Sequence, residues 1–176
     1  MSAENQDAVL KRLDEELGKQ GEKRSLIACD GSVLIMMDVT DRGTRDLDVV
    51  FPKIDPVLQQ AAKRVGSEFG LADNWLNDGP SSLSKELTAG WRSRTVTIFQ
   101  GDWLELRALD RKDLLATKLY AFCDREDDFD DVVKLKPSHD ELNKLMPWVL
   151  ARDASDLWPE RVRSCFSRLR KRLAYE

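Results

Sequence analysis

The chain has 176 residues, of which 41% are hydrophobic and 34% are charged, and its formal net charge at pH 7 is −4. This composition is typical of a globular protein with a well-solvated surface, and no apolar run approaches the roughly 20 residues that a membrane-spanning helix needs. We therefore expect no membrane association. The acidic balance also argues against a general nucleic-acid-binding domain, because such domains are usually basic.

The N-terminal sequence and the cysteines indicate a cytoplasmic protein. The N-terminal sequence is polar and amphipathic and has no apolar signal-peptide core. Cys29, Cys123 and Cys165 are widely spaced, which fits neither a disulfide framework nor a zinc site.

Residues 124–131 are strongly acidic and residues 161–172 strongly basic, so a local basic face can still meet a polyanion.

The N-terminal quarter predicts a helix followed by a buried strand. Apolar residues recur at helical spacing over residues 3–20, and Gly21 is a natural stop. Ser2 is available as the cap of this helix. Residues 25–29 form a short apolar run, which is typical of a strand in the core.

A Gly31-Ser32 pair opens the next apolar run, which predicts a short helix over residues 33–37. The free N–H groups and positive dipole end at a helix N-terminus suit a phosphate. The alternative is that the Gly-Ser pair is an ordinary turn.

Residues 45–51 predict a strand that carries two aspartates on alternate positions. Asp46 and Asp48 should share one face, because side chains two apart on a strand point the same way. Two carboxylates on one face can hold a divalent cation. They can equally belong to a solvated strand face, although aspartate is disfavoured in strands and like charges repel there.

The middle of the chain adds a helix over residues 55–69 and a hairpin. The strands of the hairpin cover residues 95–99 and 103–108, with a Gly-Asp turn between them. Glu105 lies in the second of these strands. It is a candidate third carboxylate from a neighbouring strand, or a surface residue paired with Arg107 or Arg94.

The remaining residues predict helices: one capped by Asp110, then others over 125–135, 140–151 and 159–173. Lys118 lies within an apolar stretch of the first of these helices. We expect an α+β fold with a small mixed sheet flanked by helices. Its core should comprise residues 1–135, with residues 136–176 forming a helical C-terminal segment packed on that core.

These residues together resemble the polymerase-beta-like nucleotidyltransferase superfamily. The signature of that superfamily is a Gly-Gly or Gly-Ser pair followed by two acids that flank an apolar residue on a strand, as in Gly31-Ser32 and Asp46-Leu47-Asp48. The sequences WLND at 75–78 and LDRKDLLATKLYAFCDREDDFDDVVKL at 109–135 are similar to small bacterial nucleotidyltransferase-like proteins related to abortive-infection toxins. The similarity covers most of residues 26–135.

The resemblance implies transfer of a nucleoside monophosphate from an NTP to a hydroxyl, with two Mg²⁺ ions held by the acids. It assigns the metal to Asp46 and Asp48, with Glu105 in the third carboxylate position. Gly31 and Ser32 would hold the triphosphate.

The resemblance also implies further nucleotide contacts. Lys118 would neutralise phosphate charge, and Arg45 is a further nucleotide-binding candidate. Arg125, with Asp130 or Asp131 in the acidic position after it, would complete the set.

Two hypotheses follow. The first is a metal-dependent nucleotidyltransferase, acting on RNA, tRNA or a protein hydroxyl, as the toxin of a toxin–antitoxin pair. The second is a catalytically silent relative that serves as a binding, antitoxin or assembly module. The basic residues 161–172 fit an RNA acceptor under the first hypothesis and the acidic 124–131 segment of a second copy under the second. They also fit a simple solvated helix. The sequence leaves the oligomeric state open.

Overall fold

The computed structural model describes residues 3–40 and 43–175 of the chain. The chain divides into two compact units, Met1–Asp110 and Arg111–Glu176. The boundary that the sequence suggested after residue 135 therefore falls inside the second unit. No helix within the described residues is long and apolar enough to cross a membrane.

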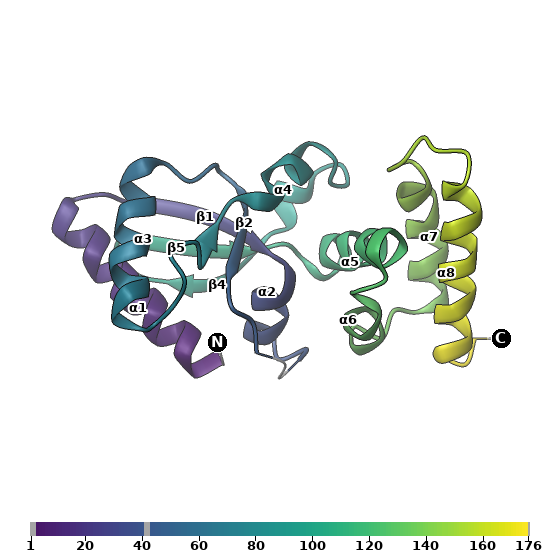
Figure 1. The fold of residues 1–176 in the computed structure, drawn as a ribbon, viewed down its shortest axis with the longest axis horizontal. Helices are drawn as coiled ribbons and strands as arrows, with labels where there is room; N and C mark the ends of the chain where they lie inside the picture. The colour runs from purple at the N-terminus through teal and green to yellow at the C-terminus, as the bar shows by residue number, and fades with distance from the viewer. Residues whose placement is uncertain (1–2, 41–42, 176) are drawn as a thin grey trace. The chain divides into compact units, whose positions relative to one another are not determined.

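The N-terminal unit is built on a mixed five-stranded sheet, in the order β3-β2-β1-β5-β4. Figure 1 labels β1, β2, β4 and β5 of this sheet. Its strands are β1 (Arg24–Cys29), β2 (Leu47–Phe51), β3 (Leu76–Asn77), β4 (Val96–Gln100) and β5 (Leu104–Ala108). Strand β1 pairs antiparallel with β2 and parallel with β5, and β4 and β5 form the expected antiparallel hairpin. The predicted mixed α+β class is confirmed.

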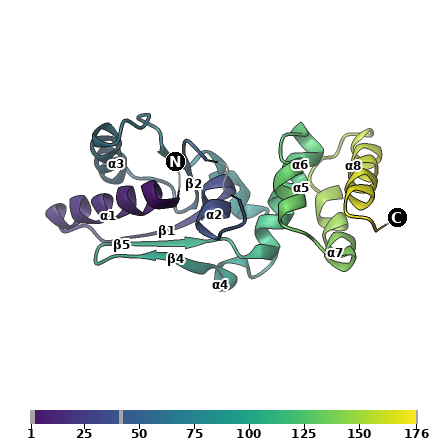
Figure 2. The same ribbon diagram turned by 90° about the horizontal axis from the view of Figure 1, so that it is seen from below.

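Helices α1 (Ala3–Gln20) and α3 (Pro56–Glu68) lie on one face of this sheet (Figure 2). Helix α1 has the predicted bounds, and Gly21 ends it with a φ of 68°. The cap proposed at Ser2 lies outside the described residues. The side chains that α1 contributes to the core are those expected from the helical spacing: Val9, Leu10, Leu13 and Leu17.

Helix α3 begins one residue after the predicted start, and Asp55 caps it. The Asp55 carboxylate accepts hydrogen bonds from the backbone N–H groups of Val57 and Leu58, and Arg24 donates to it at 3.0 Å. The hydrogen bond from Leu58, together with Arg24, holds the pKa of Asp55 below its usual value. Two apolar residues at the two ends of this helix are exposed: Val57 and Phe69.

Trp75 anchors the loop after α3 to the core, as its apolar neighbourhood indicated. The Trp75 side chain is buried, and its Nε1 donates to the carbonyl oxygen of Ala62 at 2.7 Å. The ring lies directly against Gly66 of α3. A Cβ atom at Gly66 would come within 2.6 Å of the Trp75 ring, so this helix position has room only for glycine.

Replacing Gly66 with alanine is expected to lower the free energy of unfolding by about 1–3 kcal/mol, the usual cost of overpacking a core. Helix propensity alone predicts the opposite sign, a gain of up to about 1 kcal/mol. Urea denaturation of Gly66→Ala measures the outcome. Ser67→Ala is the control, because it places alanine at an exposed position of the same helix. A Gly66→Ala variant as stable as wild type would contradict the packing.

The segment after β3 covers the other face of β2. It comprises the 3₁₀ helix η1 (Gly79–Lys85) and the short helix α4 (Trp91–Arg94), and η1 packs against β2. Val50 is consequently buried. Phe51 is exposed, and its ring lies edge-on to the ring of Trp91, with 6.4 Å between the two ring centroids. Strict alternation along β2 would group Phe51 with the buried Leu47 and Val49, but Phe51 is exposed and Val50 is buried.

The described residues of the C-terminal unit form helices and the connections between them, with no strand. It contains α5 (Arg111–Arg125), α6 (Phe129–Lys134), α7 (His139–Leu150) and α8 (Trp158–Arg172). The helix predicted over residues 125–135 is shorter than expected, because Glu126 has a φ of 66° and interrupts the chain between α5 and α6. The core of the C-terminal unit includes these buried side chains: Leu119, Phe122, Val132, Leu142, Val149, Val162 and Phe166.

Candidate functional site

Asp46 and Asp48 lie around the start of β2, where they alternate with buried side chains. Leu47 and Val49 are buried, whereas both aspartates are half-exposed. The pairing register places Asp48 between Cys29 of β1 and Asn77 of β3. The strand thus presents two carboxylates from one face, with Asp46 one residue before the strand begins.

Among the residues that the structure describes, a hydroxyl group is the side-chain partner of Asp46. The Thr44 hydroxyl donates to Asp46 Oδ1 at 3.2 Å. Asp46 forms no ion pair with any residue that the structure describes. The adjacent Arg45 is exposed, and no described contact directs it to either carboxylate. Within the described part of the chain, Asp46 is therefore held by a hydroxyl.

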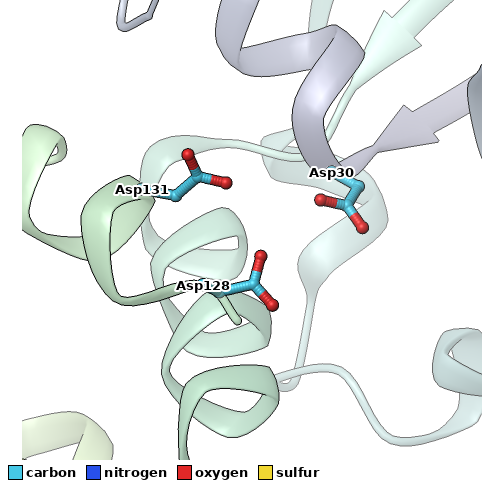
Figure 3. A group of neighbouring side chains, drawn as sticks. All are labelled: Asp30, Asp128 and Asp131. Atoms are coloured by element: carbon cyan, nitrogen blue, oxygen red, sulfur yellow. The ribbon is translucent and has the colours of Figure 1, made fainter. Parts of the chain in front are cut away.

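Gly31 and Ser32 lie in the first turn of α2 (Asp30–Met36), which begins directly after β1. Ser32 is buried, and its hydroxyl donates to the carbonyl oxygen of Cys29 at 3.4 Å. The Ser32 side chain is therefore turned into the protein. Asp30, shown at the start of α2 in Figure 3, has a φ of 69°, a conformation that few residues other than glycine adopt.

Gly31 is not required by the fold. Its backbone is outside the left-handed region, and a Cβ atom there would meet Thr44 Oγ1 at 3.7 Å, an ordinary van der Waals distance. Alanine would also be the better helix former at this position. Packing and backbone geometry thus give no reason for glycine at residue 31, and a close approach of another molecule to this backbone would give one.

Glu105 does not join the two aspartates. The parallel pairing of β1 with β5 places Glu105 opposite Ser25, whereas Asp48 lies opposite Cys29. Four residues of strand separate these positions, or about 13 Å. Within the described part of the N-terminal unit, no third ligand side chain completes a group with Asp46 and Asp48. The expected third carboxylate is thus displaced along the sheet.

Lys118, in α5 of the C-terminal unit, is buried and bound by two carboxylates. Its Nζ lies 2.6 Å from Asp128 Oδ1 and 2.8 Å from Asp131 Oδ2. Figure 3 shows the two aspartates projecting from the turn before α6 and from α6 itself. Arg125 lies 3.5 Å from the other Asp128 oxygen. The charge of Lys118 is therefore compensated within its own unit.

The sequence named only part of this cluster. Asp131 is a member, but Asp130 is exposed and Asp128, which the sequence did not single out, is buried. The available signal was the spacing of Arg125, Asp128 and Asp131, each three residues after the last. The turn between α5 and α6 then brings Asp128 and Asp131 to Lys118.

The basic helix α8 contacts the acidic segment 124–131 of its own chain. Arg168 Nη1 lies 3.0 Å from Glu126 Oε2, and Arg161 donates to the carbonyl oxygen of Asp124. Part of the acidic segment is thus already paired within the unit. Burial first of all raises the pKa of the Cys123 thiol and of the Cys165 thiol, which disfavours the thiolate form of both.

The chain belongs to a family of nucleotidyltransferases of unknown function, DUF6036, whose model matches residues 8–147. The matched segment includes the sheet, the Gly31-Ser32 pair, both aspartates of β2 and the Lys118 cluster. The comparison with curated proteins found no match, and neither did the comparison with solved structures.

Proposed function

We propose that this nucleotidyltransferase moves a nucleoside monophosphate from an NTP to a hydroxyl acceptor in the cytoplasm, using a divalent metal. The proposal rests above all on Asp46 and Asp48, which are half-exposed on one face of β2 beside the first turn of α2. The resemblance to polymerase-beta-like enzymes adds the expectation of two Mg²⁺ ions. RNA, tRNA and protein hydroxyls are the acceptors that we consider.

The residues present fit Mg²⁺. Mg²⁺ prefers oxygen ligands and is usually bound through one or two carboxylates together with substrate phosphates and water. Asp46 and Asp48 would supply those carboxylates, and no described cation competes for Asp46. A bound metal would stabilise the charge that develops on the reacting phosphate and on the leaving pyrophosphate. Thr44 would keep the Asp46 carboxylate oriented, since its hydroxyl already donates to Oδ1.

Gly31 supports a nucleotide as the substrate. The fold would accommodate a side chain at residue 31, but glycine has none. Its absence lets phosphate oxygens reach the backbone N–H groups. We assign this contact to the backbone of residues 31 and 32, because the Ser32 hydroxyl donates to Cys29. Arg45, exposed beside Asp46, is the nearest basic residue in sequence for the triphosphate.

A catalytically silent binding module is the second candidate. It is favoured by two observations: Glu105 lies away from the two aspartates, and Lys118 is bound by Asp128 and Asp131. Such a protein could serve as an antitoxin or assembly component. It would bind nucleotide weakly or not at all and would transfer nothing.

Incubation with the four α-³²P-labelled NTPs, Mg²⁺ and total RNA, with and without added protein extract, separates the two candidates. An enzyme is expected to transfer label to RNA or protein, to release pyrophosphate and to lose both with EDTA. Its melting temperature should rise with NTP and Mg²⁺ together. No label transfer, combined with no such rise, would reject the enzyme and leave the binding module.

Replacing Gly31 with alanine is expected to weaken NTP binding about tenfold, equivalent to about 1.4 kcal/mol, while leaving the fold intact. The added methyl group would stand between phosphate and backbone. Stability should stay unchanged or rise by up to about 1 kcal/mol, because alanine favours the helix. Titration calorimetry with Mg²⁺ and NTP, beside urea denaturation, gives both quantities. Equal affinity in Gly31→Ala and wild type would remove the phosphate role of this turn.

A further inference from the structure

Ser25 forms a pair with Glu105 on the sheet of the N-terminal unit. The two residues lie opposite each other on the parallel strands β1 and β5, and Ser25 is exposed. The Ser25 hydroxyl donates to Glu105 Oε2 at 2.7 Å. This distance is that of a charge-assisted hydrogen bond, in which a carboxylate accepts a hydrogen bond from a hydroxyl.

A third residue orients the carboxylate of this pair. Arg107 Nη1 lies 3.8 Å from Glu105 Oε1, and Arg107 Nη2 donates to the carbonyl oxygen of Thr95 at 2.9 Å. One oxygen of Glu105 therefore faces the hydroxyl while the other faces a fixed guanidinium. A nucleophile, a base and a group that orients the base are the arrangement that activates hydroxyls in covalent chemistry.

The pair opens into a surface cavity of about 370 Å³, lined by Lys23, Arg24, Ser25, Trp103 and Glu105, among others. Lys23 Nζ lies 5.6 Å from the centre of the Trp103 ring. Lys23, just before β1, and Arg24, the first residue of β1, thus border the Ser25 hydroxyl. A phosphodiester formed on Ser25 would find positive charge within reach, although the Arg24 guanidinium is already bound to Glu22 and Asp55.

We infer that Ser25 is a protein hydroxyl that accepts a nucleoside monophosphate, with Glu105 as the base that takes its proton. The inference rests on the proposed function and names a protein side chain as acceptor. Because Ser25 lies four residues along β1 from Cys29, the partner of Asp48, it is about 13 Å from the metal ligands of its own copy. The NTP therefore comes from a second copy of the chain.

The reaction balances without a further reagent. Ser25 Oγ attacks the α-phosphorus of the NTP, and a new O–P bond forms as the bond from that phosphorus to the bridging oxygen breaks. Pyrophosphate leaves with the electron pair of the broken bond. The hydroxyl proton passes to Glu105 Oε2. A carboxylate is sufficient for this step, since protein kinases use an aspartate to accept the proton of the hydroxyl they modify.

Mixing two forms of the chain tests the inference. Wild type serves as the catalyst, and an affinity-tagged Asp48→Asn chain serves as an acceptor that has lost its own metal ligand. After incubation with α-³²P-labelled NTPs and Mg²⁺, the tagged chain is isolated and the modified residue identified by peptide mass spectrometry. We expect label on Ser25 of the tagged chain. Placing Glu105→Gln in the tagged chain should lower the initial labelling rate about a hundredfold, the usual range for loss of a general base.

Ser93→Ala is the matched control, because the Ser93 hydroxyl is also exposed but donates to a backbone carbonyl. It should label like the parent, whereas Ser25→Ala should not label. Label on another residue, including Thr44, whose hydroxyl faces Asp46, would overturn the inference. So would an absence of label. Pyrophosphate release with RNA as acceptor then tells whether the proposed function survives, which makes the two failures distinguishable.

Discussion

Replacing Lys118 with methionine is expected to lower the free energy of unfolding of the C-terminal unit by about 3–5 kcal/mol. That is the usual cost of removing one partner from a buried ion pair. The side chain of Lys118 is 4% exposed, and those of Asp128 and Asp131 are 12% and 10% exposed. Methionine would fill a similar volume but would remove the charge that lies between the two carboxylates.

Hydrogen exchange of the α5 and α6 amides measures this loss in the unit concerned, without assuming that both units unfold together. Lys112→Met is the matched control, since Lys112 is an exposed lysine of the same helix and should change stability by less than about 0.5 kcal/mol. Adding Asp128→Asn and Asp131→Asn to Lys118→Met should recover part of the loss. Equal protection in Lys112→Met and Lys118→Met would show that the cluster does not stabilise this unit.

The elements that the sequence predicted best are those that local signals define. Helix α1 has the expected bounds because its apolar spacing and Gly21 act within a few residues. The hairpin of β4 and β5 follows in the same way from its turn. Apolar periodicity alone could not tell that Phe51 and Val57 are exposed, because that depends on which segment covers each position.

The candidate site was predictable only as far as one strand. Alternation along β2 puts Asp46 and Asp48 on one face, and burial of Leu47 and Val49 agrees with it. Alternation says nothing about register between strands. Glu105 was correctly placed beside Arg107 in its strand, but the β1–β5 register, which no local pattern encodes, sets it opposite Ser25.

Lys118 shows the same limit in the helical unit. A lysine within an apolar stretch was a visible anomaly in the sequence, but a snorkelling lysine and a buried one read alike. Its partners depend on the turn at Glu126, whose positive φ breaks the helix and returns Asp128 and Asp131 towards α5. A phosphate contact by Lys118 therefore requires the loss or rearrangement of two ion pairs.

Asp48→Asn and Asp46→Asn are each expected to lower nucleotide transfer about a thousandfold under the proposed function. Asparagine keeps the shape of aspartate but loses the charge that would bind Mg²⁺. A metal contributes several kcal/mol of transition-state stabilisation, and about 4 kcal/mol corresponds to this factor. Both side chains are half-exposed, so the folded state should tolerate the change. Initial rates of label transfer at saturating Mg²⁺ and NTP measure the loss.

Asp73→Asn is a suitable control for these two variants, because Asp73 is an exposed aspartate of the same unit, paired with Lys63 on the surface. It should transfer label at the wild-type rate. The joint rise in melting temperature with NTP and Mg²⁺ should disappear in Asp46→Asn and Asp48→Asn but persist in Asp73→Asn. If either β2 variant kept both transfer and the temperature rise, the metal would have to be bound elsewhere in the chain. If transfer fell while the rise persisted, the two aspartates would serve the chemical step and not nucleotide binding.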